Sequence, residues 1–227
     1  MSSTAGTPIG VVHRNIARAD RAAVDRLAGF GVATIHEAMG RSGLMQPYLR
    51  PIYAGAQLCG PAVTVLLQPG DNWMLHVAVE QVQAGDVVVA ACTAASDAGF
   101  FGELLATSLR ARGARGLVID GGVRDVDALE RLSFPVFATD IVLRGASKER
   151  PGSIGSVARV GDVDVEVGDW VVGDRDGVVV IRAAALEDVL AAGRSREAKE
   201  AAMFEELRGG ATTVELLGLD TSIVDRG

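Results

Sequence analysis

The chain has 227 residues, 48% hydrophobic and 22% charged, which is typical of a globular protein with a substantial core. Its formal net charge of −7 argues against nucleic acid as a direct partner, because phosphate binding needs clustered lysine and arginine. The N-terminus lacks the pattern of a signal peptide and no apolar run reaches membrane-spanning length, so we expect a cytoplasmic protein that does not bind a membrane.

Two helices are predicted first along the chain, over 19–30 and 34–39. Thr34 followed by Glu37 is the capping-box pattern, which places the start of the second helix at Thr34. His36 lies in this helix, and a structural histidine bonded to backbone is a simpler interpretation than a direct ligand.

The next predicted elements are a strand, a helix and a second strand, at 62–67, 72–82 and 87–91. Asp71 is placed to cap the helix. Asn72 and His76 are four residues apart and therefore share one helix face. Such a polar pair is more often structural than catalytic, so spacing alone assigns neither residue a role.

The densest group of chemically useful residues begins at Gly102. A helix over 103–112 starts there, and its free N–H groups and dipole favour a bound carboxylate or phosphate. A buried strand over 116–119 then ends in a glycine-rich loop, and ligands gather at such strand ends in α/β sheets. Arg124 and Asp125 follow the loop. The guanidinium can pair with a carboxylate or enolate oxygen, and the aspartate can hold a divalent ion.

The same loop has a purely structural interpretation. Gly-Gly followed by Arg-Asp is often a strand-to-helix connection in which the aspartate caps the next helix, here 126–132. Spacing does not decide between this interpretation and a ligand site.

The remaining elements are a strand over 135–138, hairpin-like β structure over 163–181 and a charged C-terminal helix over 184–207. Gly-Asp precedes an apolar run twice, at 85 and at 168, which we interpret as turn chemistry. The alternation of helices and strands predicts a layered α/β domain.

At these residues the chain resembles a known family. It is similar to the class II pyruvate aldolases that cleave 4-hydroxy-4-methyl-2-oxoglutarate and 4-carboxy-4-hydroxy-2-oxoadipate, which share a fold with the RraA-type regulators of ribonuclease E. The resemblance covers roughly 15–200, and the run Asp-Asn-Trp-Met-Leu-His at 71–76 is closest to the carboxy-hydroxy-oxoadipate branch. The runs that carry the resemblance most clearly are Gly102-Glu103-Leu104-Leu105-Ala106 and Asp120-Gly121-Gly122-Val123-Arg124-Asp125.

The resemblance implies an α/β fold of the layered α/β/α swivelling-domain type, RraA-like, with a β-barrel-like core and a C-terminal helical extension. It divides the chain into a catalytic domain over 1–183 and an extension over 184–227 that contacts a neighbouring subunit. It also implies a homotrimer or homohexamer with shared active sites.

The activity implied is a metal-dependent retro-aldol cleavage of either 2-oxo acid. One product is pyruvate, and the other is oxaloacetate from 4-carboxy-4-hydroxy-2-oxoadipate or a second pyruvate from 4-hydroxy-4-methyl-2-oxoglutarate. Oxaloacetate decarboxylation is implied as a second activity. By this resemblance, Asp125 is the protein ligand of Mg²⁺ or Mn²⁺, and Arg124 holds the keto or enolate oxygen. Glu103, and Glu200 from a partner chain, act through bound water. Glu197 is the alternative to Glu200.

Substrate binding is implied for the backbone amides of the helix start and for Asn72 as a further contact. Proton removal from the 4-hydroxyl is expected to use a water polarised by Arg124 or Glu103, because no histidine or lysine is well placed in the sequence. No role is assigned to His76. The residues expected to hold the substrate carboxylate through their amides are Gly102, Glu103, Leu104 and Leu105.

The main alternative is a regulator of ribonuclease E without enzyme activity. RraA-type proteins share the Gly-x-x-Arg-Asp region but lack the helix that carries the partner's glutamate, which favours the enzyme. A dedicated oxaloacetate decarboxylase would share the same site. A methyltransferase is not supported, because no glycine-rich nucleotide loop follows the first strand.

Overall fold

Most strands of the protein join one curved sheet. The computed structural model describes residues 9–14, 16 and 21–224. In this part of the chain the strand order is β1-β6-β5-β3-β2-β10-β11, with β4 paired to β5 and β7 paired to β2. The strands of the sheet are β1 (Arg50–Pro51), β2 (Leu58–Leu67), β3 (Val87–Cys92), β4 (Gly99–Phe101), β5 (Gly116–Val123), β6 (Val136–Ile141), β7 (Ser153–Ile154), β10 (Trp170–Gly173) and β11 (Val178–Ile181). A separate hairpin consists of β8 (Ala158–Val160) and β9 (Val163–Val165).

Three helices connect parallel strands. Strands β2, β3, β5 and β6 run parallel to one another, and α3, α4 and α5 lie between them in sequence, which makes a series of βαβ units. Among the described residues, no helix combines the length and the apolar character needed to cross a bilayer. The helices are α1 (Arg21–Ala28), α2 (Val32–Ala38), α3 (Trp73–Gln81), α4 (Glu103–Ala111), α5 (Val126–Arg131), the 3₁₀ turn η1 (Ala183–Ala185), α6 (Leu186–Arg208) and α7 (Thr213–Leu217).

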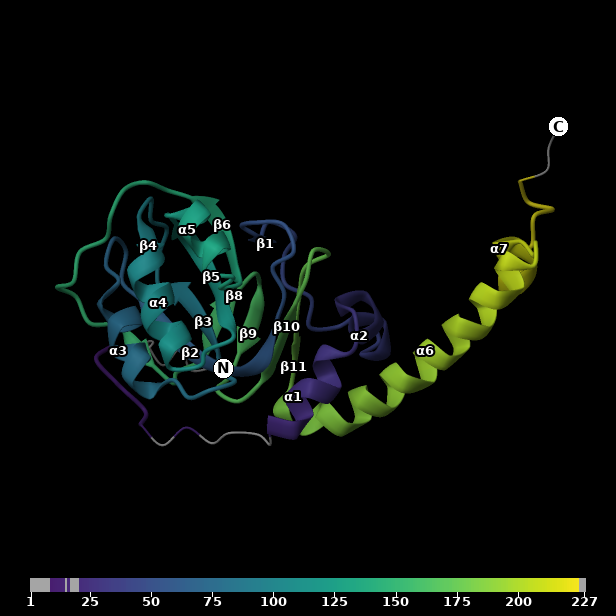
Figure 1. Ribbon diagram of the computed structural model, residues 1–227, viewed down its shortest axis with the longest axis horizontal. Helices are drawn as coiled ribbons and strands as arrows, with labels where there is room; N and C mark the ends of the chain where they lie inside the picture. Colours follow the sequence, from purple (N-terminus) through teal and green to yellow (C-terminus); the bar gives the residue numbers. More distant parts are fainter. Residues whose placement is uncertain (1–8, 15, 17–20, 225–227) are drawn as a thin grey trace, which may run out of the picture.

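Mainly apolar runs form the parallel strands, which are covered on both faces along most of their length. All ten residues of β2 are buried. Val63 and Val65 pack with helices α3 and α4, while Ala62 and Leu66 face the β8–β9 hairpin and the inner side of β10 and β11. The sheet curls around this second cluster into a nearly closed barrel (Figure 1). The predicted layered α/β fold with a barrel-like core is confirmed.

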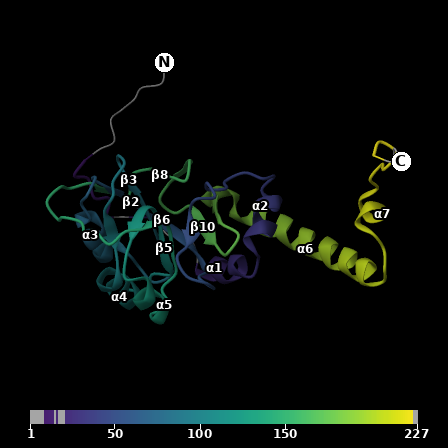
Figure 2. The ribbon, with the colours of Figure 1, turned by 90° about the horizontal axis from the view of Figure 1, so that it is seen from above.

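A third cluster joins α1, α2 and the start of α6 to the outer face of β10 and β11. Leu27, Ile35, Trp170 and Leu190 are completely or almost completely buried there. Beyond this contact α6 leaves the domain and ends near α7, on the side of the molecule away from α3 and α4 in both views (Figures 1 and 2). We call residues 194–224 the arm.

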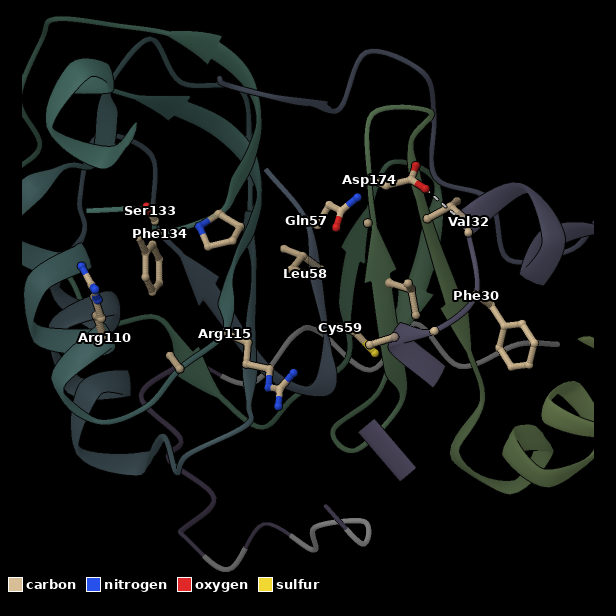
Figure 3. A pocket seen from close by; sticks show the side chains of 17 residues that line it. Phe30, Val32, Gln57, Leu58, Cys59, Arg110, Arg115, Ser133, Phe134 and Asp174 are labelled. Atoms are coloured by element: carbon tan, nitrogen blue, oxygen red, sulfur yellow. Dashed lines mark hydrogen bonds between the residues drawn. The ribbon is translucent and has the colours of Figure 1, made fainter. Parts of the chain in front are cut away.

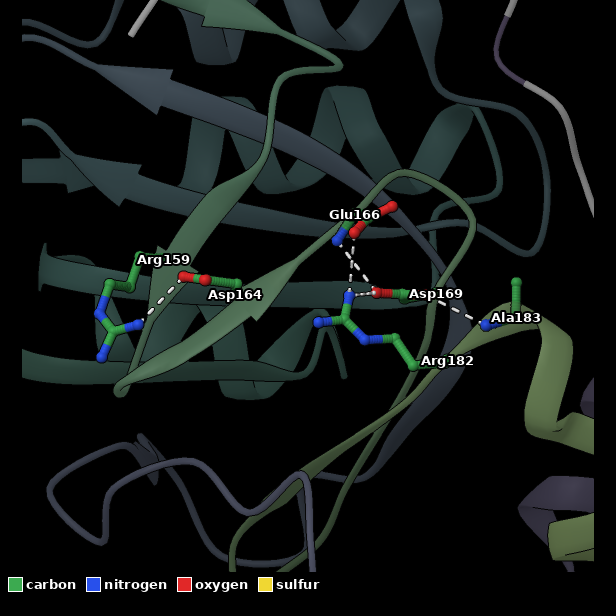
Figure 4. Close-up of polar contacts among 6 residues, drawn as sticks. All are labelled: Arg159, Asp164, Glu166, Asp169, Arg182 and Ala183. Atoms are coloured by element: carbon green, nitrogen blue, oxygen red, sulfur yellow. Dashed lines mark hydrogen bonds and ion pairs between the residues drawn. The ribbon is translucent and has the colours of Figure 1, made fainter. Parts of the chain in front are cut away.

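The base of the arm is fixed by Asp169, which is 4% exposed. Its carboxylate accepts hydrogen bonds from Arg182 Nη1 (2.7 Å) and from the N–H groups of Ala183 (3.1 Å) and Glu166 (3.0 Å), as Figure 4 shows. Asp86 likewise accepts from the N–H of the residue three positions before it, Gln83 (2.9 Å). The interpretation of both Gly-Asp pairs as turn chemistry is therefore confirmed.

The predicted start of the second helix is wrong. This helix begins at Val32 with Gly31 as its N-cap, so Thr34 lies inside it and forms no capping box. The reason is tertiary, because the Asp174 carboxylate accepts the Val32 N–H at 3.0 Å from a turn far along the chain. The first helix, predicted over 19–30, spans Arg21–Ala28 in the structure. Residues 19 and 20 lie outside the described part of the chain.

Candidate active site

Asp125 stands at the junction of the two helices that follow β4 and β5. Its backbone is left-handed (φ 59°, ψ 38°), and it occupies the N-cap position of α5 without a side-chain hydrogen bond to that helix. Its Oδ2 atom instead accepts the N–H of Glu103, the first residue of α4, at 3.0 Å. The purely structural interpretation, in which this aspartate caps the next helix, is therefore wrong for the side chain.

Gly102 makes this contact possible. A Cβ atom at Gly102 would lie 2.3 Å from Asp125 Oδ2, so any other residue would displace the carboxylate. The anion seat predicted at the start of α4 is thus partly filled by the protein's own carboxylate. The N–H groups of Leu104 and Leu105, in the same first turn, have no intrahelical acceptor and remain suited to a ligand.

A cavity of about 160 Å³ adjoins Asp125. It brings together residues that are widely separated in sequence, and it adds His76 and Lys148 to those expected from the sequence. Two cationic side chains, Arg124 and Lys148, share the wall of this cavity, which therefore suits a small anion. The predicted residues that line it are Asn72, Gly102, Leu104, Leu105, Arg124 and Asp125.

Two buried polar atoms near the start of α3, one on its N-cap residue Asn72 and one on His76, lack partners in the described part of the chain. Asn72 is 7% exposed, and its Nδ2 donates to Phe100 O at 2.7 Å, but its Oδ1 has no donor. His76 Nε2 is also buried without a partner. Burial, followed by the charge of Lys148, lowers the pKa of His76, which favours the neutral imidazole at physiological pH. Both residues therefore retain hydrogen-bonding capacity toward a ligand.

Asp71 holds the loop that carries Lys148. It is 1% exposed. Burial alone would raise the pKa of this carboxyl, but the hydrogen bonds it accepts hold the pKa below its usual value of 3.8. The same loop brings Gly145 beside Arg124, where a Cβ would lie 3.1 Å from Nη1. The Asp71 carboxylate accepts from the N–H groups of Trp73 (2.9 Å), Glu149 (2.6 Å) and Arg150 (3.0 Å) and from the Ser147 hydroxyl (2.7 Å).

Asp71→Asn should lower the free energy of unfolding at pH 7 by about 1–3 kcal/mol, because a buried charged acceptor is lost. The native pKa of Asp71 lies below the unfolded value, so its stabilisation is complete above the unfolded pKa and disappears as pH falls through the native one. Urea titrations of both proteins between pH 7 and pH 3 should therefore show a gap that closes toward low pH.

Asp97→Asn is the matched control for this titration. Asp97 pairs with Arg144 at 2.7 Å, but the two side chains are 74% and 70% exposed, so its loss should change stability little. A gap for Asp71→Asn that stays constant across the pH range would show that the charge of Asp71 is not what stabilises the loop.

Glu103 and Glu200 do not line this cavity. The exposed Glu103 side chain faces a separate open cleft of about 420 Å³ that Asp125 also borders. Glu200 lies on the arm, where its Oε1 is 2.8 Å from Arg196 Nε, and Arg196 also contacts Glu37 at 3.7 Å. Within one chain, Glu200 is therefore not part of the Asp125 site.

Asp125 is the carboxylate of this site that could hold a divalent cation. Asp125 is 43% exposed on its side chain, and its Oδ1 makes no hydrogen bond within the described residues. The described residues contain no cluster of three or more histidine, cysteine or acidic side chains suited to a metal. Mg²⁺ keeps several waters and commonly uses one or two carboxylates together with substrate oxygens. A single carboxylate between two clefts fits such an ion.

Comparison of the chain with known proteins identifies its family. A family profile described as RraA-like, Aldolase/RraA, matches residues 32–180. This chain belongs to the Aldolase/RraA family. A relative from Halalkalibacterium halodurans, named "Putative 4-hydroxy-4-methyl-2-oxoglutarate aldolase", is 31% identical over 154 residues, which cover 68% of this chain and 73% of the relative.

Solved structures agree with the Aldolase/RraA fold. An uncharacterised protein from Pseudomonas syringae aligns with a TM-score of 0.78 at 23% identity, over 87% of this chain and 93% of that one. RraAS2 of Streptomyces coelicolor, described as an unusual member of the RNase ES inhibitor RraA protein family, aligns with a TM-score of 0.72 at 26% identity, over 82% of this chain and 96% of that one.

Lys148 is the residue of this Aldolase/RraA chain that sequence reasoning missed. It lies in a polar segment that reads as a solvent-exposed loop, and only the contacts of Asp71 bring that loop back to the cavity. The expectation that no histidine or lysine is well placed is also wrong, because His76 and Lys148 both line the cavity. The sequence pattern that pointed to His76 was its four-residue spacing from Asn72, which places both residues on one helix face.

Proposed function

We propose that the protein is an aldolase that cleaves a short 4-hydroxy-2-oxo acid, 4-carboxy-4-hydroxy-2-oxoadipate or 4-hydroxy-4-methyl-2-oxoglutarate, releasing pyruvate. The observation that carries the proposal is the joining of Arg124, Asp125 and Lys148 around one small cavity at the end of β5. The names of relatives near 31% identity support the same class of reaction.

The two cations account for the recognition of a substrate with several carboxylates. Arg124 offers a planar fork of donors, which suits a carboxylate or a keto oxygen, while Lys148 offers a point charge. The free N–H groups of Leu104 and Leu105 would bind the carboxylate next to the keto group. Asn72, through its amide, would accept a hydroxyl hydrogen bond from the substrate.

A divalent cation held at Asp125, Mg²⁺ or Mn²⁺, would supply Lewis-acid polarisation of the keto oxygen when bound. Arg124 would bind the negative charge that grows on that oxygen as the carbon–carbon bond breaks. Neutral His76 would accept the proton of the 4-hydroxyl, directly or through a water. Glu103 faces the neighbouring cleft that Asp125 also borders, so it would act only through water on that side of Asp125. Decarboxylation of oxaloacetate places the same charge on the same oxygen, so we propose it as a second activity.

The test is the release of pyruvate from the two hydroxy-oxo acids and from oxaloacetate, with EDTA and after Mg²⁺ or Mn²⁺ is restored. Cleavage of a hydroxy-oxo acid that EDTA stops and metal restores is expected. Turnover of oxaloacetate alone would indicate a dedicated decarboxylase. No turnover of any substrate with either metal would overturn the proposal and favour a regulator of ribonuclease E.

The proposed site is shared between subunits of a trimer or hexamer. Of the predicted extension over 184–227, the first part packs on its own domain through Leu186, Val189 and Leu190, so the arm is the part that would contact the neighbour. Mixing inactive Glu200→Ala chains with inactive Asp125→Ala chains should then restore activity, since some interfaces join an intact Glu200 to an intact Asp125. In an equimolar random mixture about a quarter of the sites are intact. Activity is measured after subunit exchange, which differently labelled chains report.

Glu197→Ala serves as the control for this mixture, because Glu197 is an exposed carboxylate one turn before Glu200. It should remain active on its own if Glu200 is the residue that enters the neighbouring site. Absence of recovery after complete exchange, or an active monomer, would contradict the shared site.

A further inference from the structure

The two hydroxy-oxo acids of the proposed function differ in one group. In both of them C4 carries a hydroxyl and a carboxylate, but the remaining substituent is a methyl group in one and a carboxymethyl group in the other. The carboxymethyl substrate therefore has an additional negative charge, beyond the carboxylate on C4 and the one beside the keto group. The side chain that meets this charge decides which substrate the protein prefers.

The larger cavity of the molecule, of about 600 Å³, lies at the far end of α4 from Asp125. Its cations are Arg110 and Arg115, and Figure 3 shows their guanidinium groups pointing to different parts of the cavity rather than toward one point. Leu58 and Phe134, which also line it, are buried. None of its lining residues also lines the cavity at Asp125, so the choice between the substrates is made in the smaller cavity.

Two positive side chains line the cavity at Asp125, and they differ in what they have left to bind. Arg124 Nε lies 4.0 Å from Asp125 Oδ2, and in the proposed function this guanidinium binds the keto oxygen. Lys148, on the loop after β6, forms no ion pair with a carboxylate among the described residues. Lys148 is therefore the cation that is available to a further carboxylate of the substrate.

Lys148 lies close to His76. After burial, the charge of Lys148 is the second cause of the lowered pKa of that imidazole, and both side chains line the same wall of a small cavity. In the proposed function His76 accepts the proton of the 4-hydroxyl, so the ammonium is near the carbon whose substituents distinguish the two substrates. A carboxymethyl group on that carbon can pair with the ammonium, whereas a methyl group gains nothing from it.

The loop that carries Lys148 is held on both sides of this residue. After it, the N–H of Glu149 donates to the Asp71 carboxylate at 2.6 Å, and before it, the carbonyl of Arg144 accepts the N–H of Gly99 at 2.6 Å. Neither bond uses the Lys148 side chain. The main chain is therefore fixed before a ligand arrives, and pairing with a carboxylate orders only one side chain.

We propose that Lys148 sets the substrate preference of the aldolase by pairing with the carboxymethyl carboxylate of 4-carboxy-4-hydroxy-2-oxoadipate. This inference rests on the proposed function, because it concerns the same site. Lys148 is exposed, so the methyl substrate leaves its ammonium in water at little cost. The preference is thus a gain for the carboxymethyl substrate and not a penalty against the methyl one.

The experiment measures kcat/KM of both substrates for Lys148→Met, which keeps an unbranched side chain and removes the charge. The ratio of kcat/KM, carboxymethyl over methyl substrate, should fall by about tenfold or more, because one desolvated charge pair is lost. The methyl substrate is also an anion, and its own kcat/KM should fall by about threefold. Lys148→Arg keeps the charge and should return the ratio to within about threefold of wild type.

Arg144→Met is the matched control, because it removes a positive charge from the same loop outside the cavity. The Arg144 side chain is 70% exposed and pairs with the equally exposed Asp97, so its loss should disturb the loop little. The ratio of kcat/KM should stay at the wild-type value. A fall as large as that of Lys148→Met would show that general charge, and not a pair at Lys148, sets the preference.

A fall of equal size for both substrates in Lys148→Met would mean that Lys148 binds the carboxylate that they share, and it would overturn the inference. An unchanged ratio would do the same while leaving the aldolase proposal intact. Failure of the proposed function gives a different result, because the wild-type protein would then cleave neither substrate.

A binding measurement decides the matter without turnover. Citrate and citramalate differ by the same replacement of a carboxymethyl group by a methyl group, and both can be titrated into the metal-free protein in a calorimeter. Lys148→Met should weaken the binding of citrate by about tenfold more than the binding of citramalate. Equal weakening of both, or of neither, would overturn the assignment of Lys148 whether or not the protein is an aldolase.

Discussion

Replacing Asp125 with alanine should reduce pyruvate release by roughly a thousandfold, the effect of losing several kcal/mol of Lewis-acid stabilisation. The fold should survive, because the side chain is 43% exposed and makes one hydrogen bond, to the N–H of Glu103. Alanine in the left-handed conformation at this position costs about 1–2 kcal/mol, which would appear as a modest fall in melting temperature.

The measurement combines kcat/KM, thermal melting and calorimetric titration of Mn²⁺ into the substrate-free protein. Loss of Mn²⁺ binding together with loss of turnover is the expected result. Glu130→Ala, at an exposed carboxylate on α5, is the control and should keep both. An Asp125→Ala protein that turns over substrate normally in metal-depleted buffer would remove the metal assignment.

Arg124→Lys should lower kcat by about a hundredfold or more, because an ammonium cannot reproduce the planar, two-pronged contact of guanidinium with a developing oxyanion. The change should appear mainly in kcat, since Lys148 still contributes to substrate binding in the ground state. Steady-state kinetics separates kcat from KM. Arg112→Lys, at the end of α4, makes the same replacement at an exposed arginine and should leave both unchanged. Turnover within threefold of wild type would show that Arg124 is a structural residue.

The parts of the fold that sequence predicts are those decided locally. The apolar runs at 62–67, 87–91 and 116–119 become β2, β3 and β5, because a short, mainly apolar run is typical of a strand buried on both faces in the centre of a sheet. The glycine-rich loop predicted after residue 119 is wrong, because β5 continues through Gly121 and Gly122 to Val123, where it pairs with β6. Arg124 and Asp125 follow the end of that strand, as predicted.

The parts that sequence does not predict depend on single distant contacts. Helix α2 begins at Val32 because Asp174 accepts its N–H, which no local pattern contains. Lys148 enters the cavity wall because Asp71 holds its loop. The carboxylate of Asp125 turns to the start of α4 rather than to its own helix because Gly102 leaves space for it. Each of these is one side chain whose partner lies far away in sequence.

Strand β10, which pairs with β2 late in the chain, also sets the order in which the sheet can form during synthesis. Strand β2 pairs on one side with β3, which follows it closely, and on the other with β10, where Cys59 is opposite Val172. A nascent chain can therefore assemble the parallel part of the sheet early, but residues 58–61 of β2 stay unpaired on this side until β10 has left the ribosome, while β7 pairs with 65–66 before that. An apolar unpaired edge is a template for aggregation. Premature termination before β10 should thus yield an insoluble fragment, whereas loss of the arm alone should leave a closed domain.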